Sequence, residues 1–139
     1  MKKKISITKG RIINHLKGNI YKIINKKEFN IAEVYVSRIK KNAIKGWKLN
    51  KNQTSNYVVI FGKVKFAFFS KDKIFVKSLI ASSDKRNFKI IKVPPNYWYA
   101  FKGLSNNESL ILNCSDRIHN KEKSQNKPLG YLKFKWSKT

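Results

Sequence analysis

The sequence predicts an all-β fold of the jelly-roll type, in which two antiparallel sheets pack face to face. Short segments alternate apolar and polar residues and are rich in β-branched and aromatic side chains, which is typical of strands with one buried face. Gly, Asn, Asp, Ser or Pro residues bound these segments at close, regular spacing. No long segment keeps a helical period, and roughly nine strands in one domain suit a jelly roll.

The first expected strands lie before residue 51. Residues 19–24 (NIYKII) and 31–39 (IAEVYVSRI) alternate branched apolar residues with polar ones, as half-buried strands do. The segment IKGWK (44–48) is expected to form a further half-buried strand, although it places two lysines around a Gly-Trp pair. Lysine is rarely fully buried without a partner, so the environment of these two lysines needs an explanation.

The middle of the chain predicts a β-hairpin and then another strand. Residues 57–62 (YVVIFG) and 63–69 (KVKFAFF) are rich in branched and aromatic residues, and they meet at Gly62-Lys63, where a tight turn is expected. Residues 73–80 (KIFVKSLI) form the next expected strand, after a turn at Lys71-Asp72.

The last third of the chain predicts three strands and a polar tail. The strands are FKIIKV (88–93), YWYAFK (97–102) and SLILNCS (109–115), and the segment NKEKSQNKPLG (120–130) is expected to be a loop. Turns are expected before these three strands, at Asp84 to Asn87, at Pro94-Pro95-Asn96 and at Ser105 to Asn107.

Length and composition predict one globular domain. The 139 residues are 41% hydrophobic, so we expect a single domain over residues 1–139, with its core at about 15–118 and a tail over 119–139. No apolar run reaches the roughly 18–20 residues that cross a bilayer, and the basic N-terminus lacks the apolar stretch of a signal peptide. The single cysteine, Cys114, excludes an internal disulfide. We therefore expect a cytoplasmic protein without a membrane span.

Positive charge dominates the composition, with 32 Lys+Arg residues against 7 Asp+Glu residues and a formal net charge of +25. A charge of this sign favours an anionic partner, and nucleic acid is one candidate. The basic residues are nearly all lysines, whereas phosphate and base recognition commonly uses arginine forks. Abundant Lys, Asn and Ile are also the bias of an AT-rich coding sequence, so many lysines are expected on solvated faces.

Lys45 and Lys48 lie three residues apart. On a regular strand their side chains would point to opposite faces, because successive side chains alternate. Both can line one cavity only if the strand is irregular at Gly46, and glycine inside a strand often marks a bulge. The sequence therefore predicts either a bulge at Gly46 with two lysines at one anion-binding mouth, or one solvated lysine.

Five segments follow one another in an order that carries a family resemblance. They are HLKGNIYK (15–22), VSRIKKNAIKGWKLN (36–50), VVIFGKVKFAFF (58–69), IKVPPNYWYAF (91–101) and LILNCSDRIHN (110–120). No single segment is specific. In this order and spacing, from about residue 15 to 130, the chain resembles the dTDP-4-dehydrorhamnose 3,5-epimerase family of cupins.

The resemblance implies a jelly-roll (double-stranded β-helix) barrel with the substrate in its mouth, usually in a homodimer. It implies a nucleotide-diphosphate 4-keto sugar as substrate, and proton removal and return at the carbons next to the ketone. Such sugars serve surface polysaccharide (O-antigen or LPS) biosynthesis. The family needs no metal or other cofactor, and none is expected here.

The chain departs from the family at the positions that carry the chemistry. In the resemblance, the general-base histidine falls on Lys48 and the catalytic tyrosine on Leu112. A second histidine near the sugar falls on Tyr99, and the nucleotide-facing arginines fall on Lys17 and Lys45, which keep the charge without the bidentate fork. The usual acid–base pair is therefore absent.

Lys48 and Tyr99 are the candidate catalytic residues. A neutral Lys48 could remove a proton beside a ketone or form a Schiff base, and burial and the nearby Lys45 would each lower its pKa from about 10.4. The alternative is a charged Lys48 that binds a phosphate or sugar oxygen. Tyr99 is the best available proton donor, and aromatic packing is the alternative role for it.

The remaining candidate residues bind substrate. Trp47 is interpreted first as core or dimer interface and second as a sugar-stacking side chain. The only histidines, His15 and His119, do not form the cluster that a cupin metal site needs, so no metal is expected. The full set of candidate substrate-binding residues is Lys17, Arg38, Lys45, Trp47, Asn50, Tyr97 and Asn113.

Three functions remain open from the sequence. The first is an epimerase or isomerase of a nucleotide-linked keto sugar, with altered acid–base residues. The second is a non-catalytic cupin that binds a sugar nucleotide or glycan. The third is a basic nucleic-acid-binding barrel, which we rank last because no RNA-binding aromatic motif is visible.

Overall fold

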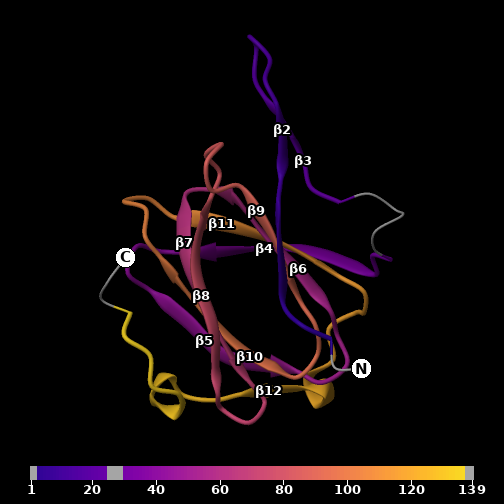
Figure 1. The fold of residues 1–139 in the computed structure, drawn as a ribbon, viewed down its shortest axis with the longest axis vertical. Coiled ribbons are helices and arrows are strands. Elements are labelled where there is room, and N and C mark those ends of the chain that lie inside the picture. Colours follow the sequence, from indigo (N-terminus) through magenta and orange to yellow (C-terminus); the bar gives the residue numbers. More distant parts are fainter. Residues whose placement is uncertain (1–2, 25–29, 137–139) are drawn as a thin grey trace.

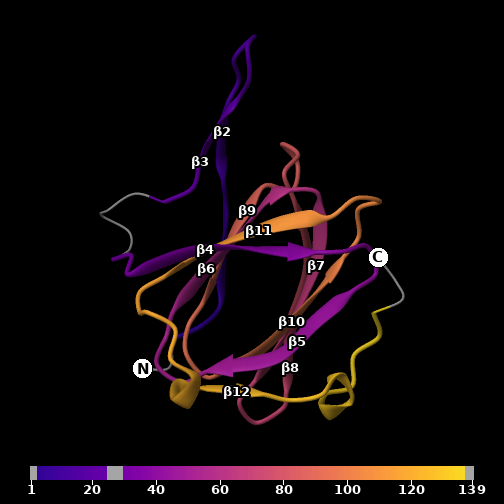
Figure 2. The same ribbon diagram turned by 180° about the vertical axis from the view of Figure 1, so that it is seen from behind.

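Two five-stranded antiparallel sheets face each other in the computed structural model, which describes residues 3–24 and 30–136 (Figures 1 and 2). One sheet has the strand order β1-β9-β6-β11-β4 and the other β12-β5-β10-β7-β8. The first sheet contains β1 (Ser6–Lys9), β9 (Lys89–Val93), β6 (Ser55–Phe61), β11 (Ser109–Ser115) and β4 (Glu33–Ile39). The second contains β12 (Ser124–Asn126), β5 (Ile44–Asn50), β10 (Tyr97–Gly103), β7 (Lys63–Ser70) and β8 (Phe75–Ser82).

The predicted all-β jelly roll is confirmed, and the predicted strands reappear within a few residues of their expected bounds. Of the predicted turns, Gly62 between β6 and β7 has a φ of 85°, in the left-handed region that glycine tolerates. The Asp84–Asn87 turn is closed by a backbone bond of 3.3 Å from the Asn87 N–H to the Asp84 carbonyl.

Three strands were not predicted. The first, β1, lies in the basic N-terminal segment, and the second is β2 (Arg11–Ile13). β2 pairs with β3 (Ile20–Lys22), which lies within the expected strand 19–24. The loop prediction for residues 120–130 is wrong in part, because this segment contains β12 and two short 3-10 helices, Lys121–Lys123 and Leu129–Tyr131. β12 has only polar residues, SQN, so it carries no alternation that sequence reasoning could detect.

The main hydrophobic core lies between the inner faces of the two sheets. Alternation along β10 directs Tyr97, Tyr99 and Phe101 into this core and Trp98 to the other face, as the sequence predicts. From β7, Phe66 and Phe68 contribute fully buried rings that stack with centroids 6.1 Å apart. The core therefore holds the aromatic side chains of β7 and β10 against branched aliphatic residues of the other sheet, which also contributes Tyr57.

A second apolar cluster covers the outer face of the β5-β10-β7 sheet. Trp47, Phe69 and Trp98 project outward there, and the C-terminal segment after β12 packs on them through Leu132 and Trp136. The tail runs below and beside this sheet in Figures 1 and 2. The C-terminal segment is therefore an integral layer of the fold, and it packs against the outer face of β5.

The β2–β3 hairpin extends away from both sheets (Figure 1). Cys114 is a buried free thiol on β11. Among the described residues, no helix is long and apolar enough to span a membrane.

Leu132→Ala tests the packing of the C-terminal layer. Leu132 is 5% exposed, so we expect its truncation to lower the free energy of unfolding by about 2–4 kcal/mol. The matched control is Leu129→Ala, at a side chain that is 41% exposed, where a loss below about 1 kcal/mol is expected. Urea unfolding followed by tryptophan fluorescence measures both, and equal small losses would show that the tail does not pack on the sheet.

Candidate functional site

The pairing of β5 with β10 is interrupted at Gly46. Lys48 lies opposite Tyr99 and Gly46 opposite Ala100, so that Trp47 has no partner of its own and the register shifts there. Gly46 has a φ of 138°, a conformation that side-chain-bearing residues rarely adopt. A Cβ at this position would lie 2.4 Å from the Ala100 Cβ and 2.7 Å from the Ala100 Cα. The bulge predicted at Gly46 is therefore confirmed, and it requires glycine.

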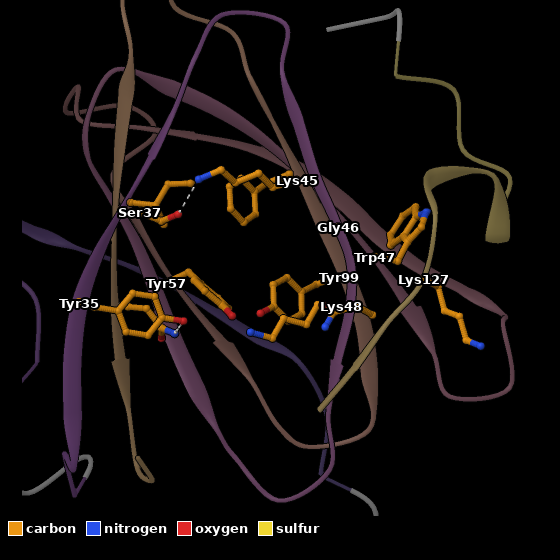
Figure 3. A pocket seen from close by; sticks show the side chains of 13 residues that line it. Tyr35, Ser37, Lys45, Gly46, Trp47, Lys48, Tyr57, Tyr99 and Lys127 are labelled. Carbon is orange, nitrogen blue, oxygen red and sulfur yellow. Dashed lines mark hydrogen bonds between the residues drawn. The ribbon is translucent and has the colours of Figure 1, made fainter. Parts of the chain in front are cut away.

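The bulge brings Lys45 and Lys48 to the same cavity, which has a volume of about 300 Å³ between the two sheets (Figure 3). Trp47, between them, points the other way, and its indole N–H donates to the Leu129 carbonyl at 3.0 Å. Lys48 and Tyr99 are paired residues on neighbouring strands, so both side chains enter the cavity from the β5-β10 wall.

Three polar side chains form a row on the opposite wall. Asn113 on β11 is paired with Tyr35 on β4 and with Tyr57 on β6, and all three line the cavity. The Asn113 amide N–H donates to the Tyr35 hydroxyl at 2.8 Å. Across the cavity, the ring of Tyr57 packs 5.2 Å from the ring of Tyr99, measured between centroids. Tyr57, Tyr99 and Lys48 thus meet where the two sheets face each other.

Lys45 contacts both sheets at the other end of the cavity. Its ammonium group donates to the Arg38 carbonyl at 2.6 Å and to the Ser37 hydroxyl at 3.3 Å. This position is the edge of the barrel, where β4 and β5 approach each other. Lys45 therefore presents a positive charge at the cavity while its backbone partner limits its motion.

The cavity is cationic. Lys45, Lys48 and Lys127 are among its lining residues, and no Asp or Glu of the described part of the chain lines it. Burial lowers the pKa of Lys48 from its ordinary value of 10.5, because desolvation penalises the charged ammonium form. The site therefore favours an anionic ligand and also raises the neutral fraction of Lys48.

Burial has the opposite effect on the pKa values of the two buried tyrosines, Tyr57 and Tyr99. Burial raises the pKa of Tyr99, against smaller opposing effects of the polar side chains of Tyr57 and Asn50, which lie near its hydroxyl without a hydrogen bond of normal geometry to the Tyr57 hydroxyl. Burial also raises the pKa of Tyr57 well above its ordinary value, and the nearby Tyr99 and Tyr35 add to this. Both phenols therefore keep their protons at neutral pH and are available as donors.

His119 lies close enough to this site for its pKa to respond. Burial lowers the pKa of the His119 imidazole, the positive charge of Lys48 lowers it further, and Glu33 opposes both. The backbone N–H of His119 donates to the Glu33 carboxylate at 3.1 Å. His119 is thus a second titratable group near Lys48. The sequence did not predict this proximity, because His119 lies in a polar segment without a strand pattern.

Of the candidate residues, Lys45, Lys48, Tyr99 and Asn113 line the cavity, and Trp47 borders it with its indole turned away (Figure 3). The indole of Trp47 is fully buried on the outer side of the sheet, so the core interpretation of this side chain is confirmed. Asn50 is buried beside Tyr99, and the Tyr97 hydroxyl donates to the Lys3 carbonyl at 2.9 Å. Neither Asn50 nor Tyr97 lines the cavity.

Two basic candidates lie outside the cavity. Lys17 is exposed in the turn of the projecting β2–β3 hairpin, where its N–H donates to the His15 imidazole at 3.1 Å. Arg38 is exposed on β4 and forms an ion pair with Glu108 at 2.6 Å. A substrate-binding role for either residue stays a prediction.

Sequence reasoning missed several cavity residues. Alternation alone would have grouped Tyr35 with Ser37, and Tyr57 with Val59, on faces that point inward. Asn126 and Lys127 come from the C-terminal segment that was expected to be a loop. Leu112, which the resemblance aligns with a catalytic tyrosine, is not a lining residue, whereas its neighbours Ile111 and Asn113 are.

A metal site is not visible in this arrangement. Among residues 3–24 and 30–136, no group of three or more His, Cys, Asp or Glu side chains is placed to hold a metal ion. The polar side chains that line the cavity carry lysine ammonium, phenol, amide and, at Ser37, hydroxyl groups.

Known proteins match this chain in structure at low sequence identity. A dTDP sugar isomerase from Desulfovibrio desulfuricans matches with a TM-score of 0.89 and 19% identity, covering 97% of this chain and 92% of that one. A dTDP-4-dehydrorhamnose 3,5-epimerase from Elizabethkingia anophelis matches with a TM-score of 0.79 and 17% identity, covering 99% and 83%. No protein-family model and no curated protein sequence matches the chain.

A third structure extends the range of reactions among the neighbours. It is a variant of the 3,4-ketoisomerase QdtA from Thermoanaerobacterium thermosaccharolyticum in complex with TDP-4-keto-6-deoxyglucose. It matches with a TM-score of 0.72 and 17% identity, covering 90% of this chain and 88% of that one. The chain therefore has the jelly-roll fold of the dTDP-4-dehydrorhamnose 3,5-epimerase-like cupins, and the resemblance predicted from the sequence is confirmed in fold.

Gly46→Ala tests the bulge that defines the site. The new Cβ meets the Ala100 backbone in an unfavourable φ region, so we expect the free energy of unfolding to fall by about 2–4 kcal/mol. Gly18→Ala is the matched control, because Gly18 has a φ of 136° but open space around it, and a loss of about 1 kcal/mol is expected. Equal losses in urea unfolding would contradict a tight approach of β5 to β10.

Proposed function

We propose that this protein is an epimerase or isomerase that acts on a nucleotide-diphosphate keto sugar, in the cytoplasmic pathway to surface polysaccharide. The fold is shared with enzymes whose names specify dTDP-linked sugars, and fold alone does not determine chemistry. The observation that carries the proposal is therefore local. A lysine with a lowered pKa lies beside a tyrosine with a raised pKa in a cationic cavity.

Lys48 is the proposed base. The carbon next to a ketone is acidic enough to lose a proton to a neutral amine within hydrogen-bond reach. Burial raises the neutral fraction of Lys48, and the ammonium ion formed by proton transfer then stabilises the negative charge on the enolate. Return of the proton to the same carbon from the other face gives an epimer. At a carbon that bears a hydroxyl, return of the proton to the former ketone carbon, with transfer of the hydroxyl proton to the former ketone oxygen, gives a ketoisomer.

Tyr99 is the proposed proton donor. Its side chain enters the cavity from the strand next to Lys48, and its raised pKa keeps the phenol protonated. A protonated phenol can donate a hydrogen bond to the ketone oxygen as that oxygen becomes an enolate, or can return a proton to carbon. Lys48 and Tyr99 thereby replace the acid–base pair that the resemblance assigns to histidine and tyrosine.

The nucleotide diphosphate would lie toward the lysines at the mouth. Lys45 presents its ammonium group to the cavity, and a volume of about 300 Å³ suits a sugar ring better than a whole sugar nucleotide. The diphosphate therefore extends out of the cavity toward Lys45. Lys17, on its projecting hairpin, would contribute only where a second chain brings it to a neighbouring mouth.

A non-catalytic sugar-nucleotide-binding protein is the second candidate. It is favoured by the lack of a His or carboxylate general base among the described lining residues. In this case Lys48 stays charged and binds a sugar or phosphate oxygen. The two candidates share the ligand and differ only in proton transfer, so a single exchange experiment separates them.

Solvent deuterium exchange tests the enzyme. Proton NMR of dTDP-4-keto-6-deoxyglucose with the protein in D2O should lose the signal of the proton at C3 or C5. We expect Lys48→Arg, which keeps the charge but cannot act as a neutral base, and Tyr99→Phe each to slow exchange by about 10²–10⁴-fold. Lys77→Met, which removes an exposed lysine of β8, is the control and should exchange at the wild-type rate.

Two outcomes of this experiment contradict the enzyme. Binding of the sugar nucleotide without exchange would favour the non-catalytic candidate. Neither exchange nor binding would exclude this substrate and leave the anionic partner open, with nucleic acid as the next ligand to measure.

A homodimer is the proposed assembly. The edge strand β4 exposes Val34 and Val36 on the outer face of its sheet, and Phe61 at the end of β6, on the far side of β11, is exposed as well. Contiguous exposed apolar residues on a sheet commonly mark a protein interface. We expect light scattering to give twice the mass of one chain and Val36→Lys to give the mass of one chain. A monomeric wild-type protein at micromolar concentration would contradict the dimer.

A further inference from the structure

Two buried polar atoms in the cavity have no hydrogen-bond partner within the described part of the chain. They are the hydroxyl of Tyr57 and the amide oxygen Oδ1 of Asn113. Tyr57 is 3% exposed and Asn113 is 0% exposed, so solvent does not readily satisfy either atom. Buried polar atoms are nearly always paired in folded proteins, and an unpaired one costs stability. Two such atoms at one cavity are therefore available to a polar group of a bound ligand.

The two atoms belong to neighbouring residues. Asn113 and Tyr57 are directly paired between β11 and β6, and both side chains point to the cavity. The amide N–H of Asn113 is already bound to the Tyr35 hydroxyl at 2.8 Å, which fixes the amide and leaves Oδ1 free. A third unpaired atom, the Asn56 amide nitrogen, is one residue before Tyr57 on β6, so strand alternation directs it to the opposite face.

The chemistry of the two atoms selects the ligand group. Asn113 Oδ1 can only accept a hydrogen bond, whereas the Tyr57 hydroxyl is available to donate one. A ketone or an ionised phosphate oxygen offers no proton to Oδ1, so it would satisfy only Tyr57. A sugar hydroxyl both accepts and donates, so one hydroxyl can satisfy both atoms at once.

We propose that Tyr57 and Asn113 together bind one ring hydroxyl of the sugar and so determine which sugar is accepted. This inference rests on the proposed function, since it requires a nucleotide-linked sugar in the cavity. The two residues would make the site discriminate between sugars that carry this hydroxyl and sugars that lack it. A sugar that lacks this hydroxyl leaves both buried atoms unpaired, and sites of this kind reject such analogues strongly.

Tyr57→Phe gives the sharpest test, because the two expected effects have opposite signs. The variant removes a hydroxyl without a partner in the free protein, so the midpoint of thermal unfolding should stay equal or rise. The same change should weaken dTDP-glucose binding by about fivefold to tenfold, the effect of one lost hydrogen bond. Calorimetric titration with dTDP-glucose and with dTDP alone measures this, and the affinity for dTDP should not change.

Asn113→Leu and the double variant test whether one hydroxyl is shared. If both residues bind the same group, the double variant should lose less affinity for dTDP-glucose than the two single variants combined. Tyr35→Phe is the matched control, because it removes the hydroxyl that binds the Asn113 amide N–H and leaves Oδ1 in place. It should weaken dTDP-glucose binding less than either single variant.

The outcomes separate this inference from the proposed function. Loss of dTDP-glucose affinity in Tyr57→Phe, with unchanged dTDP affinity and no loss of stability, supports the shared hydroxyl. Unchanged affinity for both ligands in Tyr57→Phe overturns the inference and leaves the proposed function intact. If the wild-type protein binds neither ligand, the proposed function fails and the inference fails with it.

Discussion

The register break at Gly46 is the constraint on which the site depends. A regular β5 would direct Lys45 and Lys48 to opposite faces, so that only one of them could enter the barrel. The bulge brings both to one cavity and directs Trp47 outward, where the C-terminal layer covers it. The outer packing of Trp47 and the inner placement of the lysines are therefore two consequences of one backbone irregularity.

The cavity combines two opposite responses to the same burial. Desolvation destabilises an ammonium ion and a phenolate alike, so it lowers the pKa of Lys48 and raises the pKa of Tyr99. The lysine moves toward the form that accepts a proton, and the tyrosine stays in the form that donates one. A barrel interior without carboxylates among the described lining residues can in this way supply an acid and a base from residues that are poor catalysts in water.

Alternation and glycine chemistry made most of this site predictable from the sequence. The jelly roll followed from short alternating strands, and a bulge at Gly46 was one of the two alternatives that the spacing of Lys45 and Lys48 predicted. The partners of Asn113 were not predictable, because sequence alone does not say which strands lie beside β11. Tyr35 and Tyr57, which flank the predicted Asn113, were therefore missed. β12 was missed because its residues are all polar. Leu112, which the resemblance aligns with a catalytic tyrosine, does not line the cavity, whereas its neighbours Ile111 and Asn113 do.

The ionisation of Lys48 is the most direct test of the account. Carbon NMR of protein labelled at the lysine ε-carbons follows each amine through a pH titration, and Lys48→Met identifies the signal of Lys48. The account predicts that this signal titrates at a pKa below the ordinary lysine value of 10.5, ahead of the exposed lysines. If Lys48 titrates together with them, it remains charged in the cavity, and the proposal that it removes a proton from the substrate is contradicted.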